Sequence, residues 1–196
     1  MRHTSSYITI VAVSFAGISA QAQTFDGFYA GVFAGSVSYE GGIVSFSEDS
    51  GSLTNGGILL GWRGEYGNYL YGVEADYGLP FSKEVGEFDC SAGVFPEPIC
   101  AFENDAHLRA LFGYSFNNID VFGSVGVAYA TLQQTGGATY DISGTSYGLG
   151  AEYSMSNGIT LRLEGLQDNY DDFIAPSGYD GEWKNSTVRA AAIYKF

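Results

Sequence analysis

Basic residues are scarce in this chain of 196 residues. The sequence has 8 lysines and arginines against 22 aspartates and glutamates, which gives a net charge of −14. A protein that binds nucleic acid through charge needs an excess of basic side chains, because these neutralise the phosphates. The composition therefore predicts that nucleic acid is not a partner of this protein.

Long apolar runs are also missing, except for a short one near the N-terminus. A membrane-spanning helix needs about 20 predominantly apolar residues, and the run Ile8–Ile18 is too short for that. Arg2 precedes this run, and the small-residue motif Ala20–Ala22 follows it, as in a secretory signal peptide with its cleavage site. We predict a cleaved signal peptide over residues 1–22 and a mature domain over residues 23–196. The alternative is a transmembrane anchor.

Cysteine and proline are rare, and they gather in one place. Cys90 and Cys100 are the two cysteines, and the segment Leu79–Asn104 that holds them also holds three of the four prolines. Proline in a membrane strand would remove a ladder hydrogen bond, so this segment is expected to lie outside any membrane. Because an exported protein meets an oxidising compartment, we predict a disulfide between Cys90 and Cys100. Two free thiols, or a metal site without further ligands, are the alternatives.

Glycine and aromatic residues are abundant, with 28 Gly, 15 Tyr and 14 Phe. This composition is typical of all-β proteins. The clearest stretch, Gly56–Gly78, consists of two alternating runs joined by a polar turn, and side chains alternate between two faces along a strand. One face holds Ile58, Leu60 and Trp62 in the first run and Tyr71, Val73, Ala75 and Tyr77 in the second. The opposite face holds glycine and the charged residues Arg63, Glu74 and Asp76.

The same alternation continues along the chain and predicts eight strands. They cover residues 27–37, 56–63, 69–78, 105–114, 119–131, 147–154, 159–166 and 184–196. Three short turns alternate with four long polar segments at 39–54, 79–104, 132–144 and 168–183. An even number of strands with short turns at one end and long loops at the other is the pattern of outer-membrane barrels. We therefore predict an all-β fold, an eight-stranded antiparallel transmembrane up-and-down β-barrel with its long loops outside.

The charged residues of these strands fall on the face opposite the apolar one. They are Arg63, Glu74, Asp76, Arg109, Glu152, Arg162, Glu164 and Arg189. A charged side chain that faces lipid at mid-bilayer costs roughly 2–4 kcal/mol, whereas paired charges are tolerated inside a barrel. A soluble lipocalin-like barrel, the alternative, would have its apolar residues inside. Since eight strands enclose an interior that side chains can fill, we predict that these charges form a paired network that fills the lumen. A small-solute pore is the alternative.

Several strand sequences resemble a known family. They are GFYAGVFAG (27–35), YGVEADYG (71–78), FGSVGVAYA (122–130), YGLGAEYSMSNGITLRLEG (147–165) and AAAIYKF (190–196). These stretches resemble the small bacterial outer-membrane β-barrels, the porin-like and opacity-protein-like surface antigens of alphaproteobacteria, and are similar to the barrel domain of outer membrane protein A. The resemblance covers most strands and none of the long loops.

The resemblance carries expectations about location and partners. It implies a bacterial outer-membrane protein that is exported through the inner membrane and surrounded by outer-membrane lipid and lipopolysaccharide. It implies that Tyr194 and Phe196 form a signal read by the outer-membrane insertion machinery. It also implies loops that are exposed at the surface, where a host or surface ligand could bind.

Catalytic chemistry has little support in the sequence. After removal of the signal peptide, His107 is the single histidine, and a hydrolase would need it to act as a base, with Asp105 as the nearest acid in sequence. An outer-membrane hydrolase is therefore a second alternative. We predict no catalytic residue, no cofactor and no metal site, and a structural or surface-interaction role through the acidic loops. Aromatic residues of these loops, such as Tyr170 and Trp183, are expected to be available to a partner.

Overall fold

The protein is described here by a computed structural model. The structure describes residues 26–43, 47–81, 87–89, 99–134, 139–174 and 180–196. The predicted signal peptide lies outside the described residues and stays a prediction. Cys90 also lies outside them, and no disulfide is present among the residues that the structure describes, so the pairing with Cys100 stays a prediction too.

Nine strands make up the described part of the chain. They are β1 (Gly27–Ile43), β2 (Ser47–Tyr66), β3 (Tyr69–Pro80), β4 (Glu87–Asp89), β5 (Ile99–Phe116), β6 (Ile119–Gln134), β7 (Thr139–Ser154), β8 (Ile159–Ile174) and β9 (Asp180–Lys195). No helix in the described ranges has the length and hydrophobicity that a membrane-spanning helix needs.

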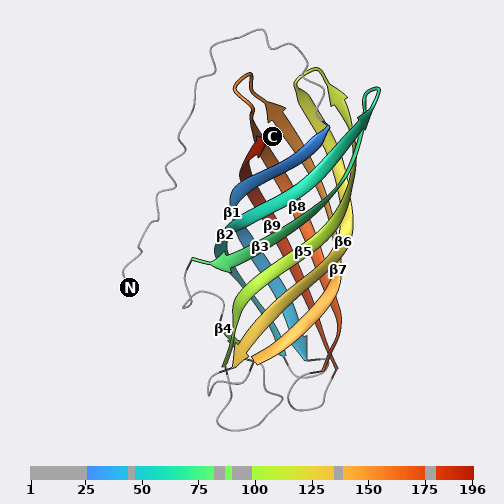
Figure 1. Ribbon diagram of the computed structural model, residues 1–196. Helices are drawn as coiled ribbons and strands as arrows, with labels where there is room; N and C mark the ends of the chain where they lie inside the picture. The colour runs from blue at the N-terminus through green and yellow to red at the C-terminus, as the bar shows by residue number, and fades with distance from the viewer. Residues whose placement is uncertain (1–25, 44–46, 82–86, 90–98, 135–138, 175–179) are drawn as a thin grey trace.

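Eight of these strands close into a barrel (Figure 1). Each long strand pairs antiparallel with its neighbours in sequence, β1 pairs with β9, and β3 pairs with β5. The three-residue strand β4 adds to the outer part of β5, where Glu87–Asp89 pairs with Ile99–Ala101. The predicted eight-stranded antiparallel barrel is therefore confirmed, with β4 as a short addition.

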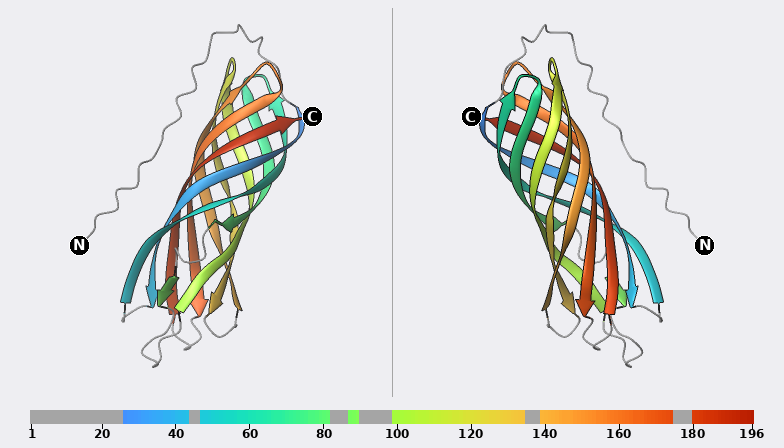
Figure 2. Two further views of the ribbon diagram at one scale, coloured as in Figure 1. Left: turned by 90° about the vertical axis from the view of Figure 1, so that its left-hand side faces the viewer. Right: turned by 90° about the vertical axis from the view of Figure 1, so that its right-hand side faces the viewer.

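The connections alternate between the two ends of the barrel, three at one end and four at the other. The hairpins β2–β3, β5–β6 and β7–β8 turn within a few residues, and Gly67, Asn117 and Gly158 adopt the positive φ angles that such turns require. The C-terminus lies at this end, which we call the turn end, and the strands joined by the other four connections meet at the opposite end, which we call the loop end (Figure 2).

The strands extend much further toward the loop end than the sequence predicted. Residues 39–54 and 168–183 were expected to be loops, yet most of the described residues in them belong to β1, β2, β8 and β9. Polar residues such as Ser38 and Glu40 suggested a loop, but they face outward, while Val37 and Tyr39 between them are buried inside the barrel. Beyond the apolar zone the strands thus have the alternation of a soluble barrel, apolar inside and polar outside.

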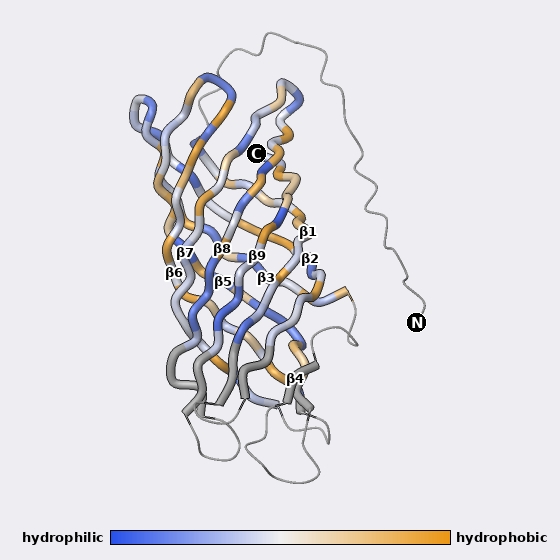
Figure 3. Tube along the Cα trace, turned by 180° about the vertical axis from the view of Figure 1, so that it is seen from behind, coloured by the Kyte–Doolittle hydropathy of each residue, from blue (hydrophilic) through white to orange (hydrophobic). Residues whose placement is uncertain are grey.

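An apolar belt surrounds the part of the barrel nearer the turn end. The outward apolar residues of these strands are exposed, among them Phe28, Val32, Leu60, Val73, Leu108, Phe112, Val125, Leu149, Leu163 and Val188. Apolar and polar residues alternate along these strands (Figure 3). An exposed apolar belt of this kind is what a barrel surrounded by lipid presents.

Candidate functional site: the charged interior

Ten ionisable side chains meet inside the barrel, at the level of the apolar belt, and all of them are buried. They include every residue of the predicted lumen network: Arg63, Glu74, Asp76, Arg109, Glu152, Arg162, Glu164 and Arg189. Asp120 and His107 complete the group, and neither was included in the prediction. We call these ten residues the charged core.

Neighbouring strands place opposite charges directly across from each other. Glu74 on β3 is the register partner of Arg109 on β5, Glu152 on β7 faces Arg162 on β8, and Glu164 faces Arg189 on β9. The side chains meet as the register suggests: Arg162 Nε donates to Glu152 Oε1 at 2.8 Å, and Arg189 Nε donates to Glu164 Oε2 at 3.0 Å. Such pairs stabilise one register of the strands over others.

Longer contacts join these pairs into one network. Arg162 donates to both carboxylate oxygens of Glu74, at 2.8 and 2.7 Å. Arg109 contacts Glu74 at 2.6 Å and Asp76 at 2.9 Å, and it also pairs with Glu164. Arg189 reaches Asp76 at 3.0 Å. Each of these arginines therefore contacts carboxylates from at least two strands.

Arg63 pairs with carboxylates across the lumen. Arg63 lies on β2, which pairs with the strand that carries Glu74 and Asp76. Its guanidinium nevertheless crosses the lumen to Glu152, with two hydrogen bonds of 2.8 Å, and to Asp120 at 3.2 Å. Asp120 and Glu152 are register partners on β6 and β7 and carry like charges. Arg63 compensates for this repulsion, because it places a positive charge against both carboxylates.

His107 lies inside the charged core and contacts two carboxylates there. Its Nδ1 lies 2.8 Å from Asp76 Oδ1, and its Nε2 lies 3.2 Å from Asp168 Oδ2. Asp105, its expected partner, is further away, at 4.0 Å from Nδ1. Asp168 was assigned to a loop, but it belongs to β8 and faces inward two positions beyond Leu166.

Glycines opposite the arginines provide room for them. Gly35 is the register partner of Arg189, Gly72 of Arg63 and Gly126 of Arg109. A Cβ atom at Gly35 would lie 2.8 Å from the Cβ of Arg189, and one at Gly126 would meet the carbonyl oxygen of Leu108. The inward glycines thus allow large guanidinium groups to cross a narrow lumen.

An apolar cluster covers the charged core on the loop-end side. It consists of Val37, Tyr39, Leu53, Phe102, Ala128, Ala130, Leu132, Ile142, Tyr170 and Trp183, all buried. Trp183 stacks on Tyr39 with ring centroids 5.3 Å apart, and its Nε1 donates to Asn185. Tyr170 and Trp183 were expected to be available to a partner, and that expectation is wrong because both face inward on β8 and β9. We call this cluster the apolar cap.

A β-bulge in β5 directs Phe102 into the apolar cap. The register with β6 shifts between Phe102 and Asn104, so one extra residue changes which face the strand presents. On the turn-end side of the bulge, His107 and Arg109 face inward at odd positions, whereas Phe102 faces inward at an even one. Sequence alternation alone cannot predict such a change of face.

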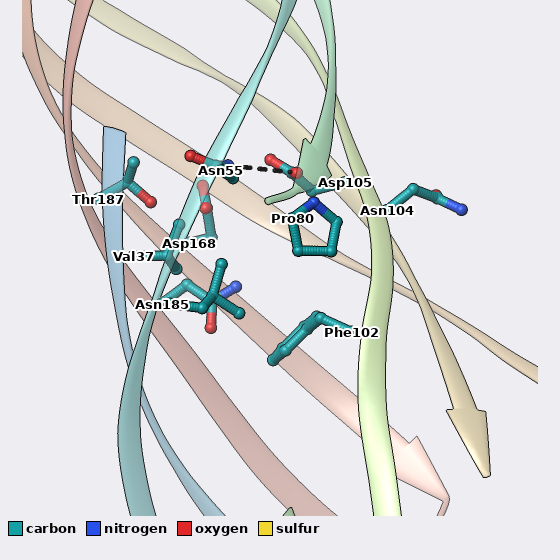
Figure 4. Close-up of a pocket in the computed structure, with 10 residues that line it drawn as sticks. Val37, Asn55, Pro80, Phe102, Asn104, Asp105, Asp168, Asn185 and Thr187 are labelled. Carbon is teal, nitrogen blue, oxygen red and sulfur yellow. Dashed lines mark hydrogen bonds between the residues drawn. The ribbon is translucent and has the colours of Figure 1, made fainter. Parts of the chain in front are cut away.

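One small cavity separates the charged core from the apolar cap (Figure 4). Its volume is about 20 Å³, and its lining includes Asn55, Phe102, Asp105 and Asp168. Asn55 donates to Asp105 Oδ1 at 3.4 Å across it. A space of this size accommodates about one water molecule and no larger solute.

Comparison with known proteins identifies the family. The model of the outer membrane protein beta-barrel domain family matches residues 8–196. The chain belongs to this family. A 22 kDa outer membrane protein of Rhizobium leguminosarum bv. viciae is 29% identical over 183 residues, which cover 89% of this chain and 80% of that protein.

Solved structures of outer-membrane proteins share the fold. Neisserial surface protein A has a TM-score of 0.53 at 11% identity, covering 87% of this chain and 97% of the other. OprG of Pseudomonas aeruginosa has a TM-score of 0.53 at 12% identity, covering 90% of this chain and 98% of the other. The family member described here is therefore a β-barrel protein of the bacterial outer membrane, as the sequence predicted.

Proposed function

We propose that this family member is a non-conducting barrel, held closed by its charged core, that uses its acidic loop end for contacts at the cell surface. The observation that carries the proposal is the path of Arg63, which crosses the lumen from β2 to reach Glu152 and Asp120. With the arginines of the other strands, it fills the cross-section with hydrogen-bonded side chains. The apolar cap blocks the same lumen a second time nearer the loop end.

The loop end is suited to contacts through charge. In the sequence, its segments hold the acidic groups Glu48–Asp49, Glu84–Asp89, Asp171–Asp172 and Asp180–Glu182, with few basic residues among them. A surface of one sign attracts partners of the other sign and speeds their association. We propose a cationic host or surface ligand as the partner of these segments.

His107 is not a catalytic base, because both ring nitrogens already contact carboxylates and neither is open to a substrate. Tyr194 and Phe196 are exposed on the outer face near the C-terminus, where the insertion machinery could recognise them.

Conductance of the refolded mature protein in a planar bilayer at high salt tests the proposal. We expect no single-channel steps from protein whose folding has been verified by heat-modifiable gel mobility, while a large porin that is refolded in the same way gives steps. Reproducible steps that change in size in an Arg63→Ala variant would show conduction through the lumen. That result would make the protein a small-solute pore.

A further inference from the structure

The outer wall of the barrel carries a polar hollow near the loop end, across β1, β9, β8 and β7. Its volume is about 540 Å³. Its lining includes Glu40, Tyr147, Gln167, Asn169, Lys184 and Ser186. Because these side chains face away from the lumen, the hollow is separate from the charged core and from the loop contacts proposed above.

The strand register brings these side chains together. Lys184 on β9 lies between its two register partners, Glu40 on β1 and Asn169 on β8. Beside it, Ser186 Oγ donates to Gln167 Oε1 at 2.7 Å, and Gln167 Nε2 donates to the carbonyl oxygen of Asn185 at 2.9 Å. These hydrogen bonds orient part of the wall of the hollow in advance of any ligand.

The hollow begins where the apolar belt ends. On the outer face of β9, Val188 lies two residues closer to the turn end than Ser186 and is 62% exposed. On β8, Gln167 and Asn169 come directly after the lipid-facing positions of Leu163 and Gly165. With the loop end outside the cell, this height is that of the headgroups of the outer leaflet.

Among the basic residues that the structure describes, Lys184 is the one whose side chain is exposed. The four arginines there are buried in the charged core, and Lys195 is half-buried at the turn end, where it donates to Ser154. This protein is strongly acidic, and the hollow holds one charge of each sign, because Glu40 on β1 is a register partner of Lys184. The lysine can pair with an anionic group, and the carboxylate can accept hydrogen bonds from hydroxyl groups. Such a set suits a ligand that combines a negative charge with sugar hydroxyls.

We propose that the hollow binds the anionic sugar headgroup of one lipopolysaccharide molecule of the outer leaflet. Lys184 contacts a phosphate or uronate carboxylate, and Gln167, Asn169 and Ser186 form hydrogen bonds with the sugar hydroxyls. The acyl chains of the same molecule lie against the apolar belt below. This inference does not depend on whether the lumen conducts or on what the loops bind.

Binding of fluorescent rough lipopolysaccharide to the refolded mature protein in detergent micelles tests this site. EDTA is present throughout, so that divalent ions cannot bridge carboxylates to the ligand. We expect Lys184→Gln to weaken binding about tenfold, because it removes a charge-assisted contact. Lys184→Arg retains the charge and is expected to bind within about twofold of the wild type. Lys195→Gln, which removes the same charge at the opposite end, is the matched control and is also expected to remain within about twofold.

Two competitors show which part of the ligand is recognised. Lipid A with its anionic groups removed and phosphatidylglycerol, which is anionic but has no sugar, are both expected to compete poorly. Equal binding by wild type and Lys184→Gln, or equal competition by either lipid, would overturn the proposal. Heat-modifiable mobility verifies that each variant is folded.

Discussion

Arg109 illustrates what a single residue contributes to the barrel. Its guanidinium contacts Glu74, Asp76 and Glu164, three buried carboxylates on two other strands. Removing one partner of a buried charge cluster costs more than the cluster itself contributes, because the remaining charges lose compensation in a medium where water cannot solvate them.

An Arg109→Met variant is expected to lose about 3–5 kcal/mol of unfolding free energy. The carboxylates of Glu74, Asp76 and Glu164 would then lie near one another, and one fewer arginine would balance their negative charges. Urea unfolding of the refolded protein, followed by heat-modifiable gel mobility, measures this loss as a lower midpoint.

Lys195→Met is the matched control for this variant. It also removes a cation that faces the interior, but this lysine is only half-buried at the turn end, so water screens its attraction to the carboxylates of Glu152 and Asp120. Its unfolding free energy is expected to fall by about 1 kcal/mol or less. An Arg109→Met midpoint equal to that of the wild type would contradict the network.

The inward direction of the charged residues could be predicted from the sequence, but their pairing could not. Alternation with a period of two places Arg63 and Glu74 on the same side of the sheet wall, and all eight of the residues named from the sequence are buried. The partners of Arg63 depend on the curvature of the closed barrel, which brings β2 opposite β6 and β7. The alternation of side chains along one strand carries no information about which side chains meet across the lumen.

At the scale of the strand, small residues decide how closely the wall can pack. On β6, Gly126 faces inward opposite Arg109, and a Cβ there would meet the backbone of Leu108. Gly123 on the same strand faces outward, and its nearest neighbours would lie 3.7 and 3.8 Å from a Cβ, which is ordinary contact.

Gly126→Ala is therefore expected to destabilise the barrel by about 1–3 kcal/mol, since the neighbouring strand must move to admit a methyl group. Gly123→Ala also adds one methyl group to this strand and is expected to be neutral or slightly stabilising. The comparison uses the same urea titration. Equal effects of the two substitutions would show that close approach at Gly126 does not limit the packing.

Strand existence was predictable for every element except β4, whereas strand length was not. The sequence indicated the lipid-facing part of each strand because its two faces differ strongly there. Beyond Val37 on β1, outward residues such as Ser38 and Glu40 are polar, so the segment resembled a loop. The inward residues Val37 and Tyr39 continue the strand because they pack into the apolar cap.

At the scale of the whole molecule, the orientation of the barrel can be tested directly. An epitope inserted between Gly136 and Gly137, in the β6–β7 connection, is expected to bind antibody on intact cells. The same epitope between Asn117 and Asn118, in the turn of the β5–β6 hairpin, is expected to bind only after permeabilisation. The opposite result would place the loop end in the periplasm and remove the proposed surface role.

The two zones of the barrel wall also determine how deeply the protein sits in its membrane. On β9 the outer face changes from Val188 to Ser186 within two residues, which is a rise of about 7 Å along the strand. A thicker bilayer would immerse Lys184 in hydrocarbon, and a thinner one would expose apolar side chains to water. Mismatch in either direction costs free energy for each ångström, so the strand sequences themselves favour a membrane of one thickness.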